Sequence, residues 1–237
     1  MLDIRKIKAI SLDLDDTLWP VWPTIARAEQ ALHDWLGVHA PMTAELFSSP
    51  MALREIRDSM TVQRPDLAGD LSALRRESIR LALRRAGDAP QLAEPAFEVF
   101  FAERQRVDFY DDALAALAFL SGRFPVVALT NGNADVHRVG IGHHFHAAIS
   151  AREFGVGKPD PRIFHAAASA AQVQPGDVLH IGDDATLDAL GATNAGLQAV
   201  WINRAGHAWP HEGPAPLTLA SLTQLCALLS GRDRPGP

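Results

Sequence analysis

Three carboxylates and a hydroxyl follow directly on a short apolar stretch near the N-terminus. Residues 7–12 predict a buried strand, and the polar residues at its carboxyl end are Asp13, Asp15, Asp16 and Thr17. Two carboxylates about 4 Å apart repel by roughly 4 kcal/mol at an effective dielectric constant near 20, so a site that keeps both ionised usually holds a cation. This run therefore indicates a metal site. The alternative is a surface turn, because Asp-Asp-Thr is also common in turns and helix caps.

Two later apolar segments end in polar residues of the same kind. Residues 125–129 predict a strand, which is followed by Thr130, Asn131, Gly132 and Asn133. Residues 178–181 predict another strand, which is followed by Gly182, Asp183 and Asp184, with Asp188 in the next helical pattern. Open parallel sheets bind ligands at the carboxyl edge of their strands, so we expect these three strand ends to meet at one crevice.

A single lysine lies between the second and third of these strands. Lys158 precedes Pro159, and Pro161 follows two residues later. Because prolines restrict the backbone, they favour a defined turn at Lys158 over a mobile surface helix. A solvated surface lysine is the alternative for Lys158 taken alone.

The order of these residues resembles that of the haloacid dehalogenase (HAD) superfamily of phosphohydrolases along nearly the whole chain. The family pattern is Asp-x-Asp-x-Thr after the first strand, Thr or Ser after the second, Lys before a helix, and Gly-Asp with a further Asp after the last. The matching residues are Asp13, Asp15, Thr17, Thr130, Lys158, Asp183 and Asp188.

The resemblance implies a separate catalytic or binding role for each of these side chains. Asp13 is the expected nucleophile, forming an aspartyl-phosphate, and Asp15 the expected acid and base for the leaving group and the water. Lys158 is the third expected catalytic residue, and the phosphate-binding residues are Thr130, Asn131 and Gly132. The expected cofactor is Mg²⁺, bound by Asp13, the backbone carbonyl of Asp15, and Asp183. The residues expected around these ligands are Thr17, Asp184 and Asp188.

The chain divides into two kinds of pattern. Strand-like and helix-like segments alternate from about residue 107, which predicts an α/β fold with a doubly wound parallel sheet. Between residues 19 and 106 the apolar residues have helical spacing, and a helical block of about 85 residues is too long for an ordinary crossover. The resemblance identifies a Rossmann-like HAD core (1–20 and 107–230) and a smaller, all-helical cap domain inserted after the first strand (21–106). Residues 231–237 are expected to form a flexible tail.

The predicted substrate is a small-molecule phosphate ester. Residues 130–133 and 180–184, followed by Trp201 and Ile202, resemble a bacterial branch that dephosphorylates FMN and 5-amino-6-(5-phospho-ribitylamino)uracil in riboflavin biosynthesis. A nucleotide or sugar-phosphate phosphatase is the alternative within the superfamily. A dehalogenase would need neither Asp15 nor Mg²⁺, and a phosphonatase would need a cap lysine that residues 19–106 lack. A non-catalytic phospho-acceptor or binding protein is a further alternative.

Composition narrows the possible partners and compartment. The 237 residues are 47% hydrophobic, which suits a chain that buries a substantial core. The net charge of −6 and pI near 5.9 argue against nucleic-acid and membrane partners. We expect a monomer or a small homo-oligomer. The single cysteine, Cys226, excludes an intrachain disulfide. We find no apolar signal segment and no stretch of about 18 apolar residues, so we expect a cytoplasmic protein.

Overall fold

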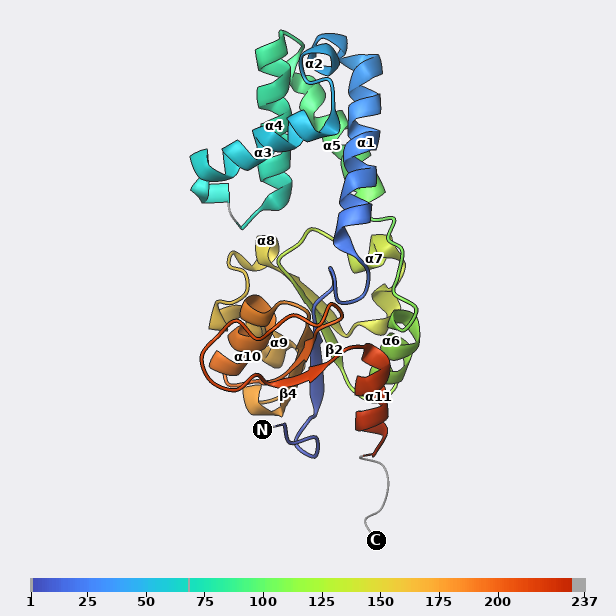
Figure 1. Cartoon of the computed structure of the whole chain (residues 1–237), viewed down its shortest axis with the longest axis vertical. Coiled ribbons are helices and arrows are strands. Elements are labelled where there is room, and N and C mark those ends of the chain that lie inside the picture. The colour runs from blue at the N-terminus through green and yellow to red at the C-terminus, as the bar shows by residue number, and fades with distance from the viewer. Residues whose placement is uncertain (1, 68, 232–237) are drawn as a thin grey trace. The chain divides into compact units, whose positions relative to one another are not determined.

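The computed structural model describes residues 2–67 and 69–231, which form two compact units (Figure 1). The core unit comprises Met1–Pro20 and Phe109–Pro237, and the helical unit comprises Val21–Asp108. Most of the predicted C-terminal tail, residues 232–237, lies outside the described residues. Within the described part of the chain, no helix is both long and apolar enough to cross a membrane.

A six-stranded parallel sheet forms the centre of the core unit, in the order β3-β2-β1-β4-β5-β6. The strands are β1 (Ala9–Leu12), β2 (Val126–Thr130), β3 (Ala147–Ser150), β4 (Val178–Gly182), β5 (Gln198–Ile202) and β6 (Leu217–Leu219). The predicted doubly wound parallel fold is confirmed. Because β1 lies between β2 and β4, the three strands whose ends carry the predicted site residues are direct neighbours.

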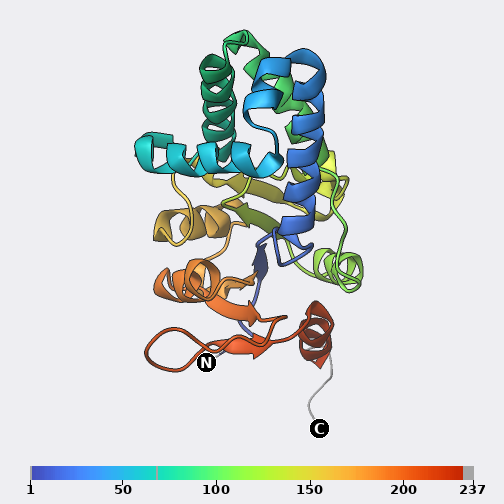
Figure 2. The same ribbon diagram turned by 45° about the horizontal axis from the view of Figure 1, so that its top comes forward.

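Helices cover both faces of this sheet (Figures 1 and 2). On one side lie α6 (Ala113–Ser121) and α11 (Leu222–Ser230), and on the other α9 (Pro161–Ala170) and α10 (Gly191–Asn194). Every residue of β1, β2 and β4 is buried, as expected for strands covered on both faces. The shorter helices of the unit are α7 (Val136–Val139), η3 (Gly142–His144), α8 (Ala151–Phe154), η4 (Pro175–Asp177) and the π-helix η5 (Ala185–Leu190).

The helical unit contains no strand among its described residues. Its elements are α1 (Val21–His39), α2 (Pro41–Leu46), α3 (Pro50–Gln63), η1 (Pro65–Leu67), α4 (Leu71–Ala86), η2 (Pro90–Leu92) and α5 (Ala93–Arg104). Apolar side chains from α1, α3, α4 and α5 form one core, because each helix presents an apolar stripe at helical spacing. A buried carboxylate in α1, Glu29, is bonded to Arg54 of α3 and Arg75 of α4. These ion pairs tie the three helices together.

Candidate active site

Three carboxylates converge at the carboxyl edge of the sheet. Asp13 follows β1, Asp183 follows β4, and Asp188 lies in η5; one carboxylate oxygen of each lies within 4.8 Å of the others. Asp13 and Asp188 are buried, with 7% and 1% of their surface exposed. The Thr17 hydroxyl lies 3.1 Å from Asp183 Oδ1 and 3.4 Å from Asp13 Oδ2, so it can donate its proton to either acid. The structure therefore brings Asp13 and Asp183 close together at this edge of the sheet.

Lys158 supplies the positive charge inside this cluster. Its buried Nζ lies 2.5 Å from Asp13 Oδ1 and 2.5 Å from Asp188 Oδ1. Burial alone would lower the pKa of Lys158, but the two carboxylates outweigh it and raise that pKa. Burial alone would raise the pKa of Asp188, but Lys158 and His180 outweigh it and lower that pKa. Lys158 and Asp188 are thus a buried, ionised pair.

The pKa values of the other two acids, Asp13 and Asp183, are raised, whereas that of Asp188 is lowered. Burial raises the pKa of Asp13 well above its ordinary value, although Lys158 opposes the effect. Burial, together with the charges of Asp188 and Asp16, raises the pKa of Asp183 to about 7. Three carboxylates and one ammonium carry a net charge of −2 when all are ionised. A hard cation with oxygen ligands would relieve this repulsion, so the residues present fit a magnesium ion.

Asp15 lies two residues after Asp13 in the loop that follows β1, and a hydrogen bond from Trp19 holds its carboxylate. Its Oδ1 accepts a hydrogen bond of 2.8 Å from the indole nitrogen of Trp19. Trp19 is fully buried and packs edge-on against Phe109. Asp16 adopts a left-handed backbone with φ of 57°, which Asp tolerates better than most residues. The packed indole therefore fixes the orientation of the Asp15 carboxyl group.

The carboxyl end of β2 brings Thr130, its last residue, and Asn131, which follows it, to the same sheet edge. Thr130 Oγ1 accepts a 2.9 Å hydrogen bond from the Gly132 N–H, which leaves its own proton to be donated elsewhere. The Asn131 side chain bonds the backbone of Lys158 twice: Nδ2 donates to the carbonyl oxygen at 2.8 Å, and Oδ1 accepts from the N–H at 2.7 Å. A Cβ on Gly157 would lie 2.6 Å from Asn131 Oδ1, so a glycine leaves room for this contact. Asn131 therefore positions the lysine loop.

Comparison with known proteins identifies the family to which this chain belongs. Residues 7–196 match the haloacid dehalogenase-like hydrolase family. The chain belongs to this family. It is similar to the Escherichia coli (strain K12) 5-amino-6-(5-phospho-D-ribitylamino)uracil phosphatase YigB, with 32% identity over 203 residues that cover 84% of each chain. A phosphoserine phosphatase from Thermus thermophilus is 40% identical over 144 residues, 58% of each chain.

A solved structure shares the whole fold. The crystal structure of 2-haloacid dehalogenase from Pseudomonas syringae pv. Tomato DC3000 superposes with a TM-score of 0.85 and 37% identity, covering 95% of this chain and 99% of the other. The predicted HAD superfamily membership is thereby confirmed. The chain is an enzyme of this hydrolase family, and its expected class, a phosphatase, agrees with both curated relatives above.

Asp184 and Asp188 were both expected around the metal ligands, and the structure separates their roles. Asp184 Oδ1 accepts hydrogen bonds of 2.7 Å from the N–H groups of Thr186 and Leu187, so this carboxylate caps the start of η5. The Asp184 N–H donates to Asp188 Oδ2 at 3.0 Å. Only Asp188 of the two contributes its carboxylate to the cluster found among the described residues.

Two buried residues inside the strands escaped the sequence prediction. Ser11 of β1 and His180 of β4 are partners in the strand register, and Ser11 Oγ lies 2.8 Å from His180 Nδ1. His180 Nε2 lies 3.0 Å from Asp188 Oδ1. A signal was present in the sequence, because both are polar residues inside otherwise apolar strands of a sheet buried on both faces.

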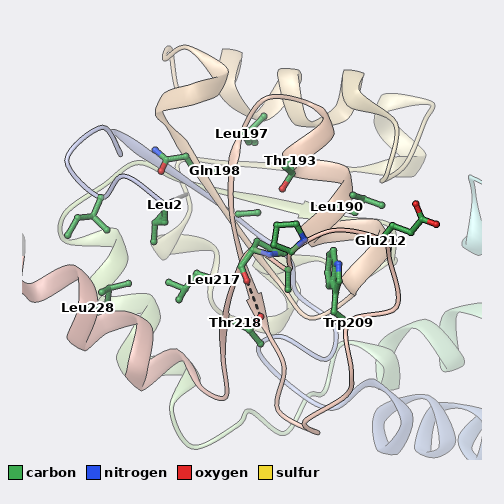
Figure 3. A pocket seen from close by; sticks show the side chains of 15 residues that line it. Leu2, Leu190, Thr193, Leu197, Gln198, Trp209, Glu212, Leu217, Thr218 and Leu228 are labelled. Carbon is green, nitrogen blue, oxygen red and sulfur yellow. Dashed lines mark hydrogen bonds between the residues drawn. The ribbon is translucent and has the colours of Figure 1, made fainter.

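A hollow lies beside β5 and the edge strand β6, away from the acid cluster (Figure 3). Its volume is about 1010 Å³, and apolar side chains such as Leu190, Trp209 and Leu217 dominate its lining. None of the predicted site residues lines it. Glu212 is its only charged lining residue among those described, so this hollow lacks the cations that a phosphate group would need.

Proposed function

We propose that the chain is a Mg²⁺-dependent phosphomonoester hydrolase that acts on small phosphorylated metabolites through a phosphoenzyme at Asp13. The observation that carries this proposal is the position of Asp13: a buried carboxylate at a strand end, 2.5 Å from the Lys158 ammonium and linked to Asp183 through Thr17. Such a carboxylate can attack a phosphorus atom, since the neighbouring positive charge offsets the charge of the incoming phosphoryl group.

The reaction has two displacements. In the first, an Asp13 oxygen forms a bond to phosphorus, the bond from phosphorus to the ester oxygen breaks, and Asp15 donates a proton to the departing alkoxide. In the second, Asp15 takes a proton from water, which attacks phosphorus and releases inorganic phosphate with the Asp13 carboxylate restored. Trp19 supports this role, because its hydrogen bond holds the Asp15 carboxyl group in one orientation.

The phosphoryl oxygens are bound by four donor groups in this proposal. Thr130 donates its hydroxyl proton, Lys158 contributes its ammonium, and the backbone N–H groups of Asn131 and Gly132 complete the set. The Gly132 N–H is bonded to Thr130 Oγ1, so it exchanges that partner for a phosphoryl oxygen when substrate binds.

Asp13, the backbone carbonyl of Asp15, and Asp183 would hold Mg²⁺. When bound, Mg²⁺ neutralises phosphoryl charge at the reacting centre. The raised pKa values of Asp13 and Asp183 support this assignment, because burial and then the neighbouring carboxylates disfavour the ionised form of each, and a bound cation would offset both effects.

The favoured substrates are 5-amino-6-(5-phospho-ribitylamino)uracil and FMN, which would place the chain in riboflavin biosynthesis. The support is the similarity to YigB over 84% of both chains. Other nucleotide or sugar phosphates are the alternative, because the same fold serves relatives named for different phosphate esters. We assign selection of the leaving group to the helical unit, Val21–Asp108, as a cap domain.

A dehalogenase is the second candidate, and the similarity to the Pseudomonas syringae 2-haloacid dehalogenase structure favours it. A halide leaving group needs no proton, whereas an alkoxide does. The presence of Asp15 two residues after Asp13, with its carboxyl group held by Trp19, therefore favours the phosphatase.

Product release from a substrate panel tests these alternatives. The panel contains 5-amino-6-(5-phospho-ribitylamino)uracil, FMN, nucleoside monophosphates, sugar phosphates and 2-chloropropionate, each assayed with Mg²⁺ and with EDTA. We expect phosphate release that requires Mg²⁺ and is lost in Asp13→Asn. Asp177→Asn is the control, since this acid forms an ion pair with Lys8 at the other end of β4. Chloride release without phosphate release would establish the dehalogenase, and an active Asp13→Asn variant would remove the covalent mechanism.

A further inference from the structure

A hydrogen-bonded chain leads from the interior of the sheet to the proposed nucleophile. It begins at Ser11 Oγ, passes through the His180 ring to Asp188 Oδ1, and continues through Lys158 Nζ to Asp13 Oδ1, with successive distances of 2.8, 3.0, 2.5 and 2.5 Å. All five residues are buried. The roles proposed above use Asp13 and Lys158 and leave His180 and Ser11 unexplained.

The chemistry of the partners determines which nitrogen of His180 carries a proton. Asp188 is ionised against Lys158 and can only accept, so His180 Nε2 must donate to it. Burial lowers the pKa of His180, so the ring is neutral and Nδ1 has a lone pair. The Ser11 hydroxyl therefore donates to Nδ1. This serine fixes the tautomer in which His180 can serve Asp188.

The His180 ring has little freedom to leave this position. Phe164 of α9 packs edge-on against it, with ring centroids 5.1 Å apart and an angle of 90° between the planes. Ser11 and His180 are also register partners on adjacent strands, so the backbone of the sheet sets their separation.

Asp188 is held from several sides at once. Oδ1 accepts from His180 and Lys158, and Oδ2 accepts from the Asp184 N–H. The side of Asp188 facing Gly182 is closed, because a Cβ added to Gly182 would lie 2.2 Å from Asp188 Cγ. His180 is thus the donor that comes from the rigid sheet rather than from a loop.

We propose that His180, oriented by Ser11, is a positioning residue that holds Asp188 in place, so that Asp188 keeps the Lys158 ammonium on Asp13. This inference rests on the proposed roles of Asp13 and Lys158. It assigns His180 no contact with substrate: the residue acts through Asp188. A charge-assisted hydrogen bond in a buried network is the type of contact whose loss allows a carboxylate to rotate and a lysine to shift.

Two substitutions of His180 separate positioning from packing. His180→Leu fills the space with an apolar side chain and removes the donor, whereas His180→Gln places an amide N–H close to the position of Nε2. We expect His180→Leu to lower kcat for phosphate release by about tenfold to hundredfold, with KM changed much less. We expect His180→Gln to recover most of that loss. Leu179→Val, a buried substitution on the same strand, is the control for lowered stability alone.

The position of the lysine can be measured without turnover. Lys158 is one of three lysines in the chain, with Lys6 and Lys8, so its side-chain nitrogen can be observed by NMR after ¹⁵N-lysine labelling. We expect His180→Leu to shift or broaden the Lys158 Nζ signal, while His180→Gln and Leu179→Val leave it close to that of the wild type.

Two results would overturn the inference. One is a Lys158 signal that is unchanged in His180→Leu. The other is an equal loss of kcat in His180→Leu and His180→Gln, which would show that the imidazole matters for packing alone. Failure of the proposed function has a different signature, because wild-type protein would then release no phosphate while the lysine signal still reported on His180.

Discussion

Replacing Lys158 by methionine removes the cation from the acid cluster and keeps a side chain of similar length. The side chains of Lys158, Asp13 and Asp188 are exposed by 3%, 9% and 2%, and both ion pairs measure 2.5 Å. Removing one partner of a buried ion pair costs about 3–5 kcal/mol of unfolding free energy, because the remaining charge stays buried without compensation. We expect a loss of this size for Lys158→Met at pH 8.

The same substitution at Lys8 provides the matched control. Lys8 Nζ lies 2.7 Å from Asp177 Oδ2, almost the same separation, but the lysine side chain is 62% exposed. Exposed pairs contribute about 0–1 kcal/mol, because water screens the charges. Lys8→Met should therefore leave the unfolding free energy nearly unchanged, and the difference between the two variants isolates the effect of burial.

The loss in Lys158→Met should depend on pH. In the wild type, the pKa of Asp188 is below its ordinary value, so its pairing contributes stability above the unfolded-state pKa that is lost as pH falls. Without Lys158, burial raises the pKa values of Asp188 and Asp13 in the folded state. A raised folded-state pKa gives stability at low pH that is lost as pH rises. The variant should thus be most destabilised, relative to wild type, at high pH.

Urea unfolding followed by circular dichroism, at pH 8 and at pH 5.5, measures both effects. The reasoning requires a deficit several times larger for Lys158→Met than for Lys8→Met at pH 8, and a smaller deficit at pH 5.5. Equal, small deficits for both variants at pH 8 would refute it, because they would show that the acid cluster is solvated and does not depend on its internal cation.

Two further predictions concern the metal and the lysine loop. Because burial and neighbouring charge raise the pKa of Asp183 to about 7, Mg²⁺ must displace a proton from this carboxyl group when the pH is below 7. Calorimetric titration should therefore show that the affinity for Mg²⁺ weakens as pH falls from 8 to 5.5. A constant affinity over this range would contradict the prediction. Asn131→Ala removes two hydrogen bonds from the Lys158 backbone, together worth about 1–3 kcal/mol, and should lower kcat by tenfold or more. Asn203→Ala is its control, because this half-buried amide also makes two hydrogen bonds to a backbone, that of His207. Equal kcat values in the two variants would argue against a positioning role for Asn131.

The sequence was sufficient to place the acids because their position depends on topology. Asp13, Thr130 and Asp183 each follow an apolar strand, and neighbouring parallel strands bring their carboxyl ends to one edge. Predicting that these residues lie at one edge requires only that the strands are parallel neighbours, and it requires no knowledge of side-chain contacts. The family resemblance added Lys158, whose loop has no such topological constraint.

Other features depend on packing that no local pattern encodes. Asn131 was predicted to bind phosphate, but its side chain bonds the Lys158 backbone, a contact between residues 27 positions apart in the sequence. The edge strand β6, Leu217–Leu219, is short and largely exposed, so it lacks the apolar run that marks β1 and β4. The helical pattern predicted around Asp188 is divided into η5 and α10, and Asp188 of η5 is bonded to Lys158 in the cluster.

His180 shows why a break in an apolar pattern deserves a physical explanation. Burying an imidazole in a strand is unfavourable unless both of its nitrogens are bonded. Ser11 and Asp188 satisfy them, one on the neighbouring strand and one beside the proposed nucleophile. An apolar residue at position 180 would avoid this requirement, but it would leave the buried Ser11 hydroxyl and Asp188 without their His180 partner. One of these bonds ends on Asp188 Oδ1, the same oxygen that pairs with Lys158. We therefore expect replacement of His180 by an apolar residue to disturb the acid cluster more than the fold.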